Sequence, residues 1–289
     1  MVYGDLQFFD IIIFAVIAVF IIYRLRSVLG KRTGFQKNTN EKQFIKKNEE
    51  ELKVKTPQLK ESEQKLEVVY KKVPSFDHKI FLDGAKKAFE IMKNEFKVIA
   101  DLVEKNTRVL DVGCADGVLM EFLRDNKDID IRGLEISKNK VQKCIEKGLT
   151  VIEGNAEFDL KQFPDKSFDY VILSQTLQAF LNPELVINEL LRVGKKAIVT
   201  IPNFGYWKVR LHLLIKGTMP VTKTLPDQWY DTPNLHMCTI KDFVYFVRSR
   251  NFKIFKSLAL NEKNTSLINN NNLGIKNLFS DLGIFLIEK

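Results

Sequence analysis

The chain of 289 residues is long for one domain and short for two large ones, and its 45% apolar content with 22 phenylalanines is ample for a hydrophobic core. The formal charge of +9 is compatible with a nucleic acid or an anionic membrane as partner. Because much of the Lys and Arg lies at residues 24–32 and just after, we expect membrane-proximal charge and no nucleic-acid partner. The cysteines (Cys114, Cys144 and Cys238) are widely spaced, which indicates free thiols in a reducing compartment and no metal site.

The first predicted element is a membrane anchor. Residues 6–23 are almost wholly apolar, near the lower limit for a helix that crosses a bilayer, and Arg24 and Arg26 follow at once. A cleaved signal peptide would carry its positive charge before the apolar run, so that reading is excluded. The alternative is a buried core helix, but nothing amphipathic is visible. Residues 1–33 are therefore expected to form a single-pass anchor in the bacterial inner membrane, with the rest of the chain on the cytoplasmic side.

A charged segment and a helix are expected next. Residues 34–74 are dense in Lys, Glu, Asn and Gln and cannot bury enough apolar surface to order themselves, so we expect a flexible linker. In residues 75–96 apolar side chains recur at helical spacing, for example Phe89, Met92 and Phe96. The pattern leaves open whether this amphipathic helix covers the edge of the following domain, residues 97–289, or binds another protein.

The next feature is a strand that runs into a glycine-rich turn. The apolar residues of 107–112 end in Gly113 and Gly117, and a helical pattern follows immediately. A second strand, 129–134, ends on Glu135, where an acid accepts hydrogen bonds from ribose hydroxyls in nucleotide-binding folds. A merely structural turn is the alternative, but the whole strand–turn–helix–strand–acid context favours a nucleoside-bearing cofactor. The turn is not the Gly-x-Gly-x-x-Gly pattern of dinucleotide sites.

Strands and helices alternate beyond this point, which predicts a parallel sheet with helices on both faces. An aromatic-rich insert, residues 206–238, interrupts the alternation, and residues 261–272 are expected to form an Asn-rich loop. The further elements predicted are helices at 138–147, 183–191 and 240–250 and strands at 151–152, 168–173, 196–201, 252–260 and 284–287.

This arrangement resembles the class I S-adenosylmethionine-dependent methyltransferases. The resemblance implies a Rossmann-like mixed α/β sheet and S-adenosylmethionine as cofactor. It assigns the turn with Asp111, Gly113, Ala115 and Gly117 to the family's first motif and Glu135 to the ribose. Ala115 stands where the family usually has glycine; if the position needs a positive φ, the extra Cβ costs about 1 kcal/mol and puts cofactor affinity in doubt. It further places Asn155, Ala156 and Glu157 beside the adenine, and Ser174 and Gln175 facing the methyl donor.

Longer motifs are similar to the MetW family of bacterial methionine-biosynthesis proteins. They are Ser-Gln-Thr-Leu-Gln-Ala at 174–179, Leu-Arg-Val-Gly-Lys-Lys-Ala-Ile-Val at 191–199, Pro-Asn-Phe-Gly-Tyr-Trp-Lys-Val-Arg at 202–210, Met-Pro-Val-Thr-Lys at 219–223 and Trp-Tyr-Asp-Thr-Pro-Asn-Leu-His at 229–236. The resemblance covers residues 96–289 and implies a role in methionine synthesis alongside homoserine O-acyltransferase. It does not by itself establish methyl transfer.

The N-terminal part resembles a different family. Residues 9–34 and 74–90 are similar to the start of bacterial relatives of the mitochondrial import-motor membrane anchor, whose globular domain is not present here. The chain therefore reads as a fusion with its join near residues 94–98. A natural fusion and an error of gene assembly both fit the sequence.

Methyl transfer requires an aligned acceptor and, for some nucleophiles, a base. In the insert, Asp231 and His236 are close enough in sequence to share a loop over the pocket and are the candidates; a histidine that only packs is the alternative. Three functions follow. They are a cofactor-binding, methyltransferase-fold protein of methionine biosynthesis, a non-catalytic activator of the acyltransferase with the same fold, and a membrane scaffold with an import-anchor-like role.

Overall fold

The computed structural model describes residues 78–222, 225, 227–261 and 264–289. By its internal contacts the chain divides into two units, Met1–Phe76 and Asp77–Lys289, and the second unit is described below. The predicted anchor (1–33) and charged linker (34–74) lie outside the described residues. Within the described ranges, no helix combines the length and the apolar character needed to cross a bilayer.

An eight-stranded sheet, ordered β3-β2-β1-β4-β5-β8-β6-β7, forms the centre of the second unit. Its first five strands are parallel, as the alternation of strands and helices predicts. Strand β8 pairs antiparallel with both β5 and β6, and β7 pairs antiparallel with β6. The mixed sheet expected of a class I methyltransferase fold is confirmed. The strands are β1 Thr107–Val112, β2 Ile129–Glu135, β3 Val151–Glu153, β4 Phe168–Ser174, β5 Gly194–Pro202, β6 Lys253–Leu260, β7 Thr265–Leu267 and β8 Leu282–Glu288.

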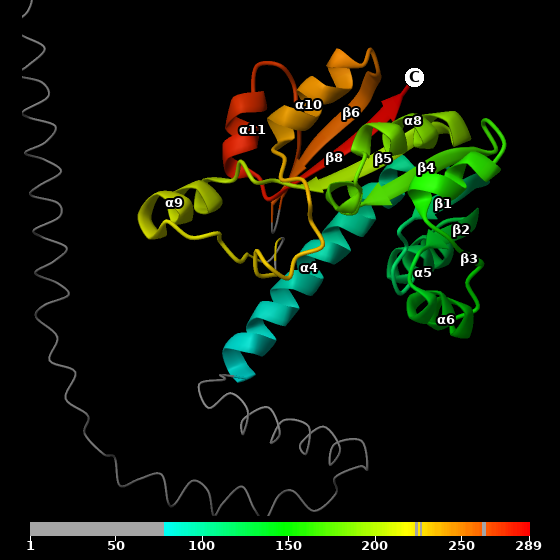
Figure 1. Ribbon diagram of the computed structural model, residues 1–289, viewed down its shortest axis with the longest axis horizontal. Helices are drawn as coiled ribbons and strands as arrows, with labels where there is room; N and C mark the ends of the chain where they lie inside the picture. The colour runs from blue at the N-terminus through cyan, green and yellow to red at the C-terminus, as the bar shows by residue number, and fades with distance from the viewer. Residues whose placement is uncertain (1–77, 223–224, 226, 262–263) are drawn as a thin grey trace, which may run out of the picture. The chain divides into compact units, whose positions relative to one another are not determined.

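Helices cover both faces of the sheet (Figure 1), which confirms the predicted layering. One core lies under α4 His78–Leu102, α5 Val118–Asn126 and α6 Lys138–Glu146. The other lies under α7, α8, α10 and α11, together with the short 3-10 segments η1 and η2. The central strands are buried on both faces, which is why they read as unbroken apolar runs in the sequence. These second-face elements are α7 Ala156–Asp159, η1 Leu160–Gln162, η2 Leu177–Ala179, α8 Pro183–Val193, α10 Ile240–Ser249 and α11 Leu273–Phe279.

Helix α4 is longer than the sequence predicted. It continues past residue 96 to Leu102, because Phe96, Ile99 and Ala100 extend its apolar stripe and are buried. The predicted division at residue 96 and the join near 94–98 therefore fall inside one continuous helix. The helix covers part of the sheet, which is the first of the two roles that the sequence pattern left open; the second was binding to another protein.

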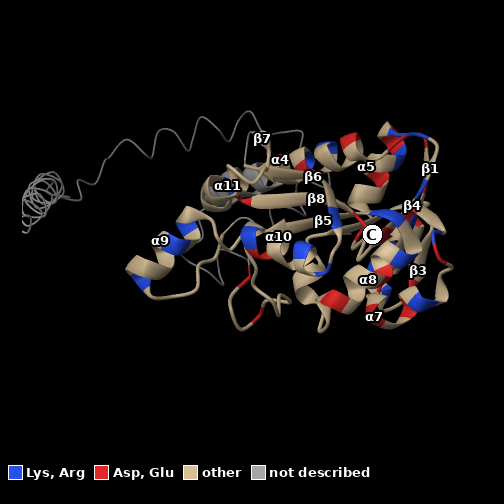
Figure 2. Cartoon of the chain, turned by 90° about the horizontal axis from the view of Figure 1, so that it is seen from above, with Lys and Arg blue, Asp and Glu red and all other residues tan. Residues whose placement is uncertain are grey.

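Two further segments differ from the prediction. The insert after β5 contains a helix, α9 Trp207–Lys216, of which Val209 is the buried residue. Figure 2 shows Lys and Arg on this helix without Asp or Glu, and Figure 1 shows it at a distance from the sheet. The expected Asn-rich loop at 261–272 contains β7 at Thr265–Leu267, because this segment pairs with the edge of β6.

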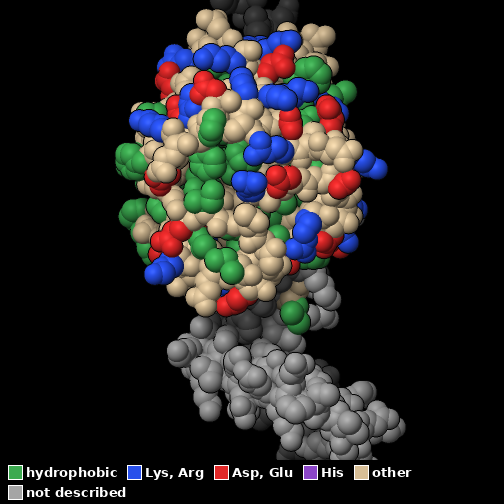
Figure 3. Space-filling view, turned by 90° about the vertical axis from the view of Figure 1, so that its right-hand side faces the viewer, with side chains coloured by type: hydrophobic (Ala, Val, Ile, Leu, Met, Phe, Trp, Pro, Cys, Tyr) green, Lys and Arg blue, Asp and Glu red, His purple; other side chains and the backbone are tan. Residues whose placement is uncertain are grey.

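Charges of both signs are interspersed on the face of the second unit that Figure 3 shows. Elsewhere among the described residues, charges of opposite sign pair across neighbouring strands, such as Lys195 Nζ with Asp169 at 2.7 Å and Lys253 Nζ with Glu288 at 2.7 Å. Exposed pairs of this kind contribute little stability.

Candidate functional site

The turn between β1 and α5 adopts the left-handed conformation at three residues. Gly113 and Gly117 have φ of 73° and 74°, and Ala115 has φ of 50°. A Cβ on Gly113 would lie 2.9 Å from Thr176 Cγ2, so the turn packs directly against the segment that follows β4. The turn lies at the carboxyl end of the sheet, where ligands bind in open α/β folds.

Glu135, at the end of β2, is buried and its carboxylate faces this turn. Oε2 accepts the amide N–H of Ala115 at 2.9 Å, and Oε1 accepts the amide N–H of Ser137 at 2.9 Å. A carboxylate oxygen can accept more than one hydrogen bond, so each oxygen of Glu135 is still able to accept one from a ligand hydroxyl. The predicted ribose acid and the turn are therefore brought together.

A crevice of about 390 Å³ lies between this turn and helix α4. The side chain of Asp111, the predicted cofactor acid, lines it and is 2% exposed. In the part of the chain that the structure describes, no donor hydrogen-bonds the Asp111 carboxyl group. The other lining residues are Met92, Glu95, Phe96, Gly113, Cys114, Ala115, Asp116, Val118, Leu119, Lys140, Ser174 and Gln175.

Burial raises the pKa of Asp111 to about 7, and the negative charges of Glu135 and Glu95 act in the same direction. A buried carboxylate without a partner is costly, so this group needs either a proton or a cation beside it. The crevice is therefore built to receive a positively charged group at Asp111.

Glu95 is a site residue that the sequence analysis missed. It projects from α4, is fully buried, and accepts hydrogen bonds from Thr200 Oγ1 at 2.6 Å, Ser174 Oγ at 2.9 Å and Gln175 Nε2 at 2.6 Å. Burial raises its pKa, against the lowering effect of these hydrogen bonds. The signal was present in the sequence, because Glu95 lies at helical spacing within the apolar stripe of Met92, Phe96 and Ile99.

We expect Glu95→Ala to lower the free energy of unfolding by about 2 kcal/mol, because three donors at the ends of β4 and β5 lose their acceptor. Urea denaturation of the full chain measures this. Glu90→Ala is the matched control, since Glu90 is an exposed glutamate of the same helix and its loss should change stability by less than about 0.5 kcal/mol. Equal stability of the two variants would contradict the role given to Glu95.

Ser174 and Gln175, the residues predicted to face a methyl donor, line the crevice but are held by Glu95. Gln175 has φ of 49°, and its amide N–H donates to Thr200 Oγ1 at 3.0 Å. A left-handed residue other than glycine is strained, and such strain persists only when surrounding contacts fix it. The network of Glu95 and Thr200 provides these contacts.

Ala115 has a positive φ, which is the backbone conformation in which its Cβ is expected to cost stability. We expect Ala115→Gly to raise the free energy of unfolding by about 1 kcal/mol, because a Cβ disfavours this conformation. Chemical denaturation checks the value. The control Ala100→Gly, in the interior of α4, should change stability by about the same amount with opposite sign. A loss of stability in Ala115→Gly would contradict the strain assigned to this residue.

The three residues predicted beside an adenine do not line the crevice. Asn155 caps α7, with its Oδ1 accepting the Glu157 amide N–H at 2.9 Å, and Glu157 Oε1 accepts the Asn182 amide N–H at 2.8 Å. Ala156 is buried in the core. In contrast, Ile136, directly after Glu135, is exposed and offers apolar surface that the sequence analysis did not consider.

The predicted catalytic pair, Asp231 and His236, does not line the crevice either. Asp231 is exposed in a turn. His236 donates its backbone N–H to the Gln178 carbonyl at 3.0 Å and borders a different cavity. The insert thus places both residues away from the crevice, and their catalytic role stays a prediction.

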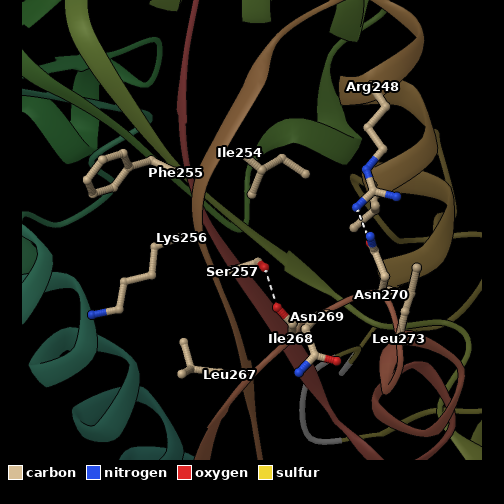
Figure 4. Close-up of a pocket in the computed structure, with 11 residues that line it drawn as sticks. Arg248, Ile254, Phe255, Lys256, Ser257, Leu267, Ile268, Asn269, Asn270 and Leu273 are labelled. Atoms are coloured by element: carbon tan, nitrogen blue, oxygen red, sulfur yellow. Dashed lines mark hydrogen bonds between the residues drawn. The ribbon is translucent and has the colours of Figure 1, made fainter.

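A cavity of about 250 Å³ at the far edge of the sheet, between α10, β6 and β7, is shown in Figure 4. Two of its polar side chains are already paired: Ser257 Oγ donates to the Ile268 carbonyl at 3.0 Å, and Arg248 Nη2 donates to Asn270 Oδ1 at 2.6 Å. We assign no ligand to it, since no group there calls for one.

Comparisons with known proteins agree with this architecture. The family model of the methionine biosynthesis protein MetW matches residues 93–287. The bifunctional methionine biosynthesis protein MetXA/MetW of Rhodopirellula baltica is 35% identical over 153 residues, which are 50% of this chain and 25% of that protein. The demethylmenaquinone methyltransferase of Listeria welshimeri is 31% identical over 175 residues, covering 55% of this chain and 72% of that enzyme.

Among solved structures, a Thermotoga maritima SAM-dependent methyltransferase, described as a possible histamine N-methyltransferase, has a TM-score of 0.53. It is 17% identical and covers 73% of this chain and 96% of that one, so the likeness concerns the fold alone. The family match begins at residue 93 and gives no support to the import-anchor-like fragment predicted before it. The matched part of the chain spans about a quarter of the bifunctional relative, 25%.

Proposed function

The chain belongs to the MetW family of methionine biosynthesis proteins, and from this we propose that it binds S-adenosylmethionine in the crevice at Asp111. The observation that carries the proposal is the buried Asp111 carboxyl group, which lines the crevice and lacks a hydrogen-bond donor among the described residues. S-adenosylmethionine carries an ammonium and a sulfonium, so it supplies the missing positive charge.

Residues next to the crevice would hold the other parts of this molecule, because the Glu135 carboxylate accepts the amide N–H of Ala115, which lines the crevice. Glu135 would accept the ribose hydroxyls, and the exposed Ile136 would pack against the adenine. Gly113 allows the turn to pack directly against Thr176, where a Cβ would lie only 2.9 Å from Cγ2. S-adenosylmethionine supplies, when bound, a methyl group activated for transfer to a nucleophile. This chain's own residues would bind and orient it.

Isothermal titration calorimetry of the full chain with S-adenosylmethionine tests the proposal. We expect saturable binding at one site. The absence of heat at millimolar ligand would overturn it, and S-adenosylhomocysteine provides a comparison ligand without the sulfonium charge.

Homoserine O-acyltransferase is the partner we propose. Support comes from the relative named as bifunctional MetXA/MetW, in which a MetW part belongs to one chain with a second activity. Helix α9 offers a surface for such a partner, because Leu214 is 82% exposed and Ile215 is 66% exposed beside the basic residues of the same helix. Exposed apolar groups of this kind are typical of protein interfaces.

We expect Ile215→Asp to weaken binding to the homoserine O-acyltransferase of the same organism about tenfold, because a charge would be buried in the interface. Surface plasmon resonance with the two purified proteins measures the change. Ile275→Asp is the matched control, since Ile275 is 61% exposed on α11 and is not part of the insert. The same loss in both variants would contradict a role for α9.

A specific observation also favours the second candidate, a non-catalytic activator of the acyltransferase with the same fold. Ser174 and Gln175 are engaged by Glu95, and neither Asp231 nor His236 lines the crevice. Stimulation of the acyltransferase without any methylated product would select this candidate. The inner-membrane, cytoplasm-facing location and the import-anchor-like scaffold stay proposals that rest on residues 1–90 of the sequence.

A further inference from the structure

A second cavity, of about 440 Å³, lies between η2, the beginning of α8 and α10. Apolar and polar side chains both line it, and within the described residues it shares no lining residue with the crevice at Asp111. Its volume falls in the range of sites that hold small organic molecules. The wall residues used below are Leu177, Pro183, Phe243 and Phe246.

Gln178, which belongs to the lining of this cavity, carries one buried polar atom without a partner among the described residues. Gln178 is 1% exposed, and its Nε2 donates to Cys238 Sγ at 3.6 Å. In the described ranges of the chain, its Oε1 has no hydrogen-bond donor. The backbone of Gln178 is fixed in place, because its main-chain carbonyl accepts the amide N–H groups of Leu235 and His236 at 2.8 and 3.0 Å. A buried side-chain oxygen such as Oε1 is costly unless a donor reaches it.

The charged groups at the cavity are already engaged. Arg250 Nε lies 2.6 Å from Glu184, and the Asp242 carboxylate accepts the Thr239 amide N–H at 2.9 Å. Burial raises the pKa of Cys238 to about 11, so its thiol stays neutral. An anionic ligand group at Gln178 would find the arginine already paired and the Asp242 charge close to Cys238, so an uncharged donor is favoured over an anion.

We propose that this cavity binds a small, uncharged and largely apolar molecule that donates one N–H or O–H hydrogen bond to Gln178 Oε1. Its apolar body packs between Leu177, Phe243 and Phe246. The site is distinct from the one proposed for S-adenosylmethionine, so either can fail without the other.

Two probes of nearly equal shape test the proposal on the full chain. They are 4-methylphenol, which carries a hydroxyl donor, and 4-methylanisole, in which a methyl group replaces that hydrogen. Calorimetry and saturation-transfer NMR give both dissociation constants. We expect 4-methylphenol to bind about fivefold more tightly, which is the usual effect of one hydrogen bond. Equal affinities, tighter binding of 4-methylanisole, or no saturable binding of 4-methylphenol would overturn the proposal.

Gln178→Met removes the amide at similar size and is expected to abolish the difference between the probes. Gln142→Met, at an exposed glutamine of α6, should leave it unchanged. Phe246→Trp provides a second variant that does not depend on Gln178, because the larger ring reduces the cavity and should weaken both probes at least threefold. A fivefold difference that persists in Gln178→Met, or unaltered binding in Phe246→Trp, would place the probes elsewhere.

Discussion

Asp111→Asn is expected to make the ligand-free protein more stable at pH 8 while it weakens binding of S-adenosylmethionine about 100-fold, because a charged hydrogen bond to the ligand ammonium is lost. The gain in stability, about 2 kcal/mol, arises because the variant no longer buries an unpaired carboxylate. Thermal or urea unfolding at pH 8 and calorimetric titration of the same preparation measure the two effects.

The pH dependence of the wild type follows from the same group. In the unfolded chain the pKa of an aspartate is about 3.9, whereas burial raises the pKa of Asp111 to about 7 in the folded protein. The contribution of this group to the free energy of unfolding is therefore fully present below about pH 3.9 and is lost as the pH rises through about 7. Ligand affinity changes in the opposite sense, because the ammonium binds the ionised form.

We therefore expect the wild-type affinity to fall about fivefold from pH 7 to pH 6, and this change to be much smaller in Asp111→Asn. Burial also raises the pKa of Glu95, whose charge acts on Asp111, so a residual slope in the variant is assigned to Glu95. A variant that binds as tightly as the wild type, or that is less stable at pH 8, would contradict the account of Asp111.

Glu135→Ala is expected to lower the affinity for S-adenosylmethionine at least 100-fold. Two effects combine: the ribose hydroxyls lose a charged acceptor, and the amides of Ala115 and Ser137 lose the oxygens that position the turn. Calorimetry on the full chain measures the loss, and circular dichroism establishes that the variant is folded.

The matched control is Glu153→Ala, since Glu153 ends β3, pairs in register with Glu135 and is exposed. Its affinity should stay within about twofold of the wild type. Glu135→Gln should show an intermediate loss, because the amide retains one acceptor. A folded Glu135→Ala protein that binds normally would remove the basis for placing the ribose here.

The turn and the acid were readable from the sequence because their signals are local. An apolar run, two glycines at fixed spacing and Glu135 at the next strand end specify strand, turn and acid without knowledge of the packing around them. The alternation of strands and helices similarly predicted the sheet and its two helical layers. The structure agrees with these predictions because each of them depends on a short stretch of chain.

What could not be predicted depends on contacts between distant residues. Glu95 becomes part of the crevice only because α4 packs over the ends of β4 and β5, which lie 79 and 105 residues further along the chain. His236 donates its backbone N–H to the Gln178 carbonyl, and its position is decided by how the insert returns to the sheet. Helix α9 lacks a clear amphipathic pattern, so periodicity did not reveal it.

Capping accounts for a further difference. Asn155 and Glu157 stand in a motif expected at an adenine, but Asn155 accepts an amide N–H within its own turn. Short polar side chains compete for nearby backbone donors in this way, and only the structure shows which donor they take. Asn203, directly after β5, also accepts a nearby amide N–H, that of Gly205 at 2.9 Å, and donates to the carbonyls of Asn277 and Ser280 at 2.8 and 2.7 Å, so it joins the end of β5 to the region of α11.

The position of β8 has a consequence for how the molecule is made. This strand lies between β5 and β6 although it is synthesised after both of them and after β7. Until it emerges from the ribosome, β5 presents an open edge, and β6 with β7 has no place to dock. Open edges of this kind favour pairing with other chains. Release of a finished sheet therefore waits for the last strand to be translated, and a ribosome that stalls before it leaves an aggregation-prone intermediate.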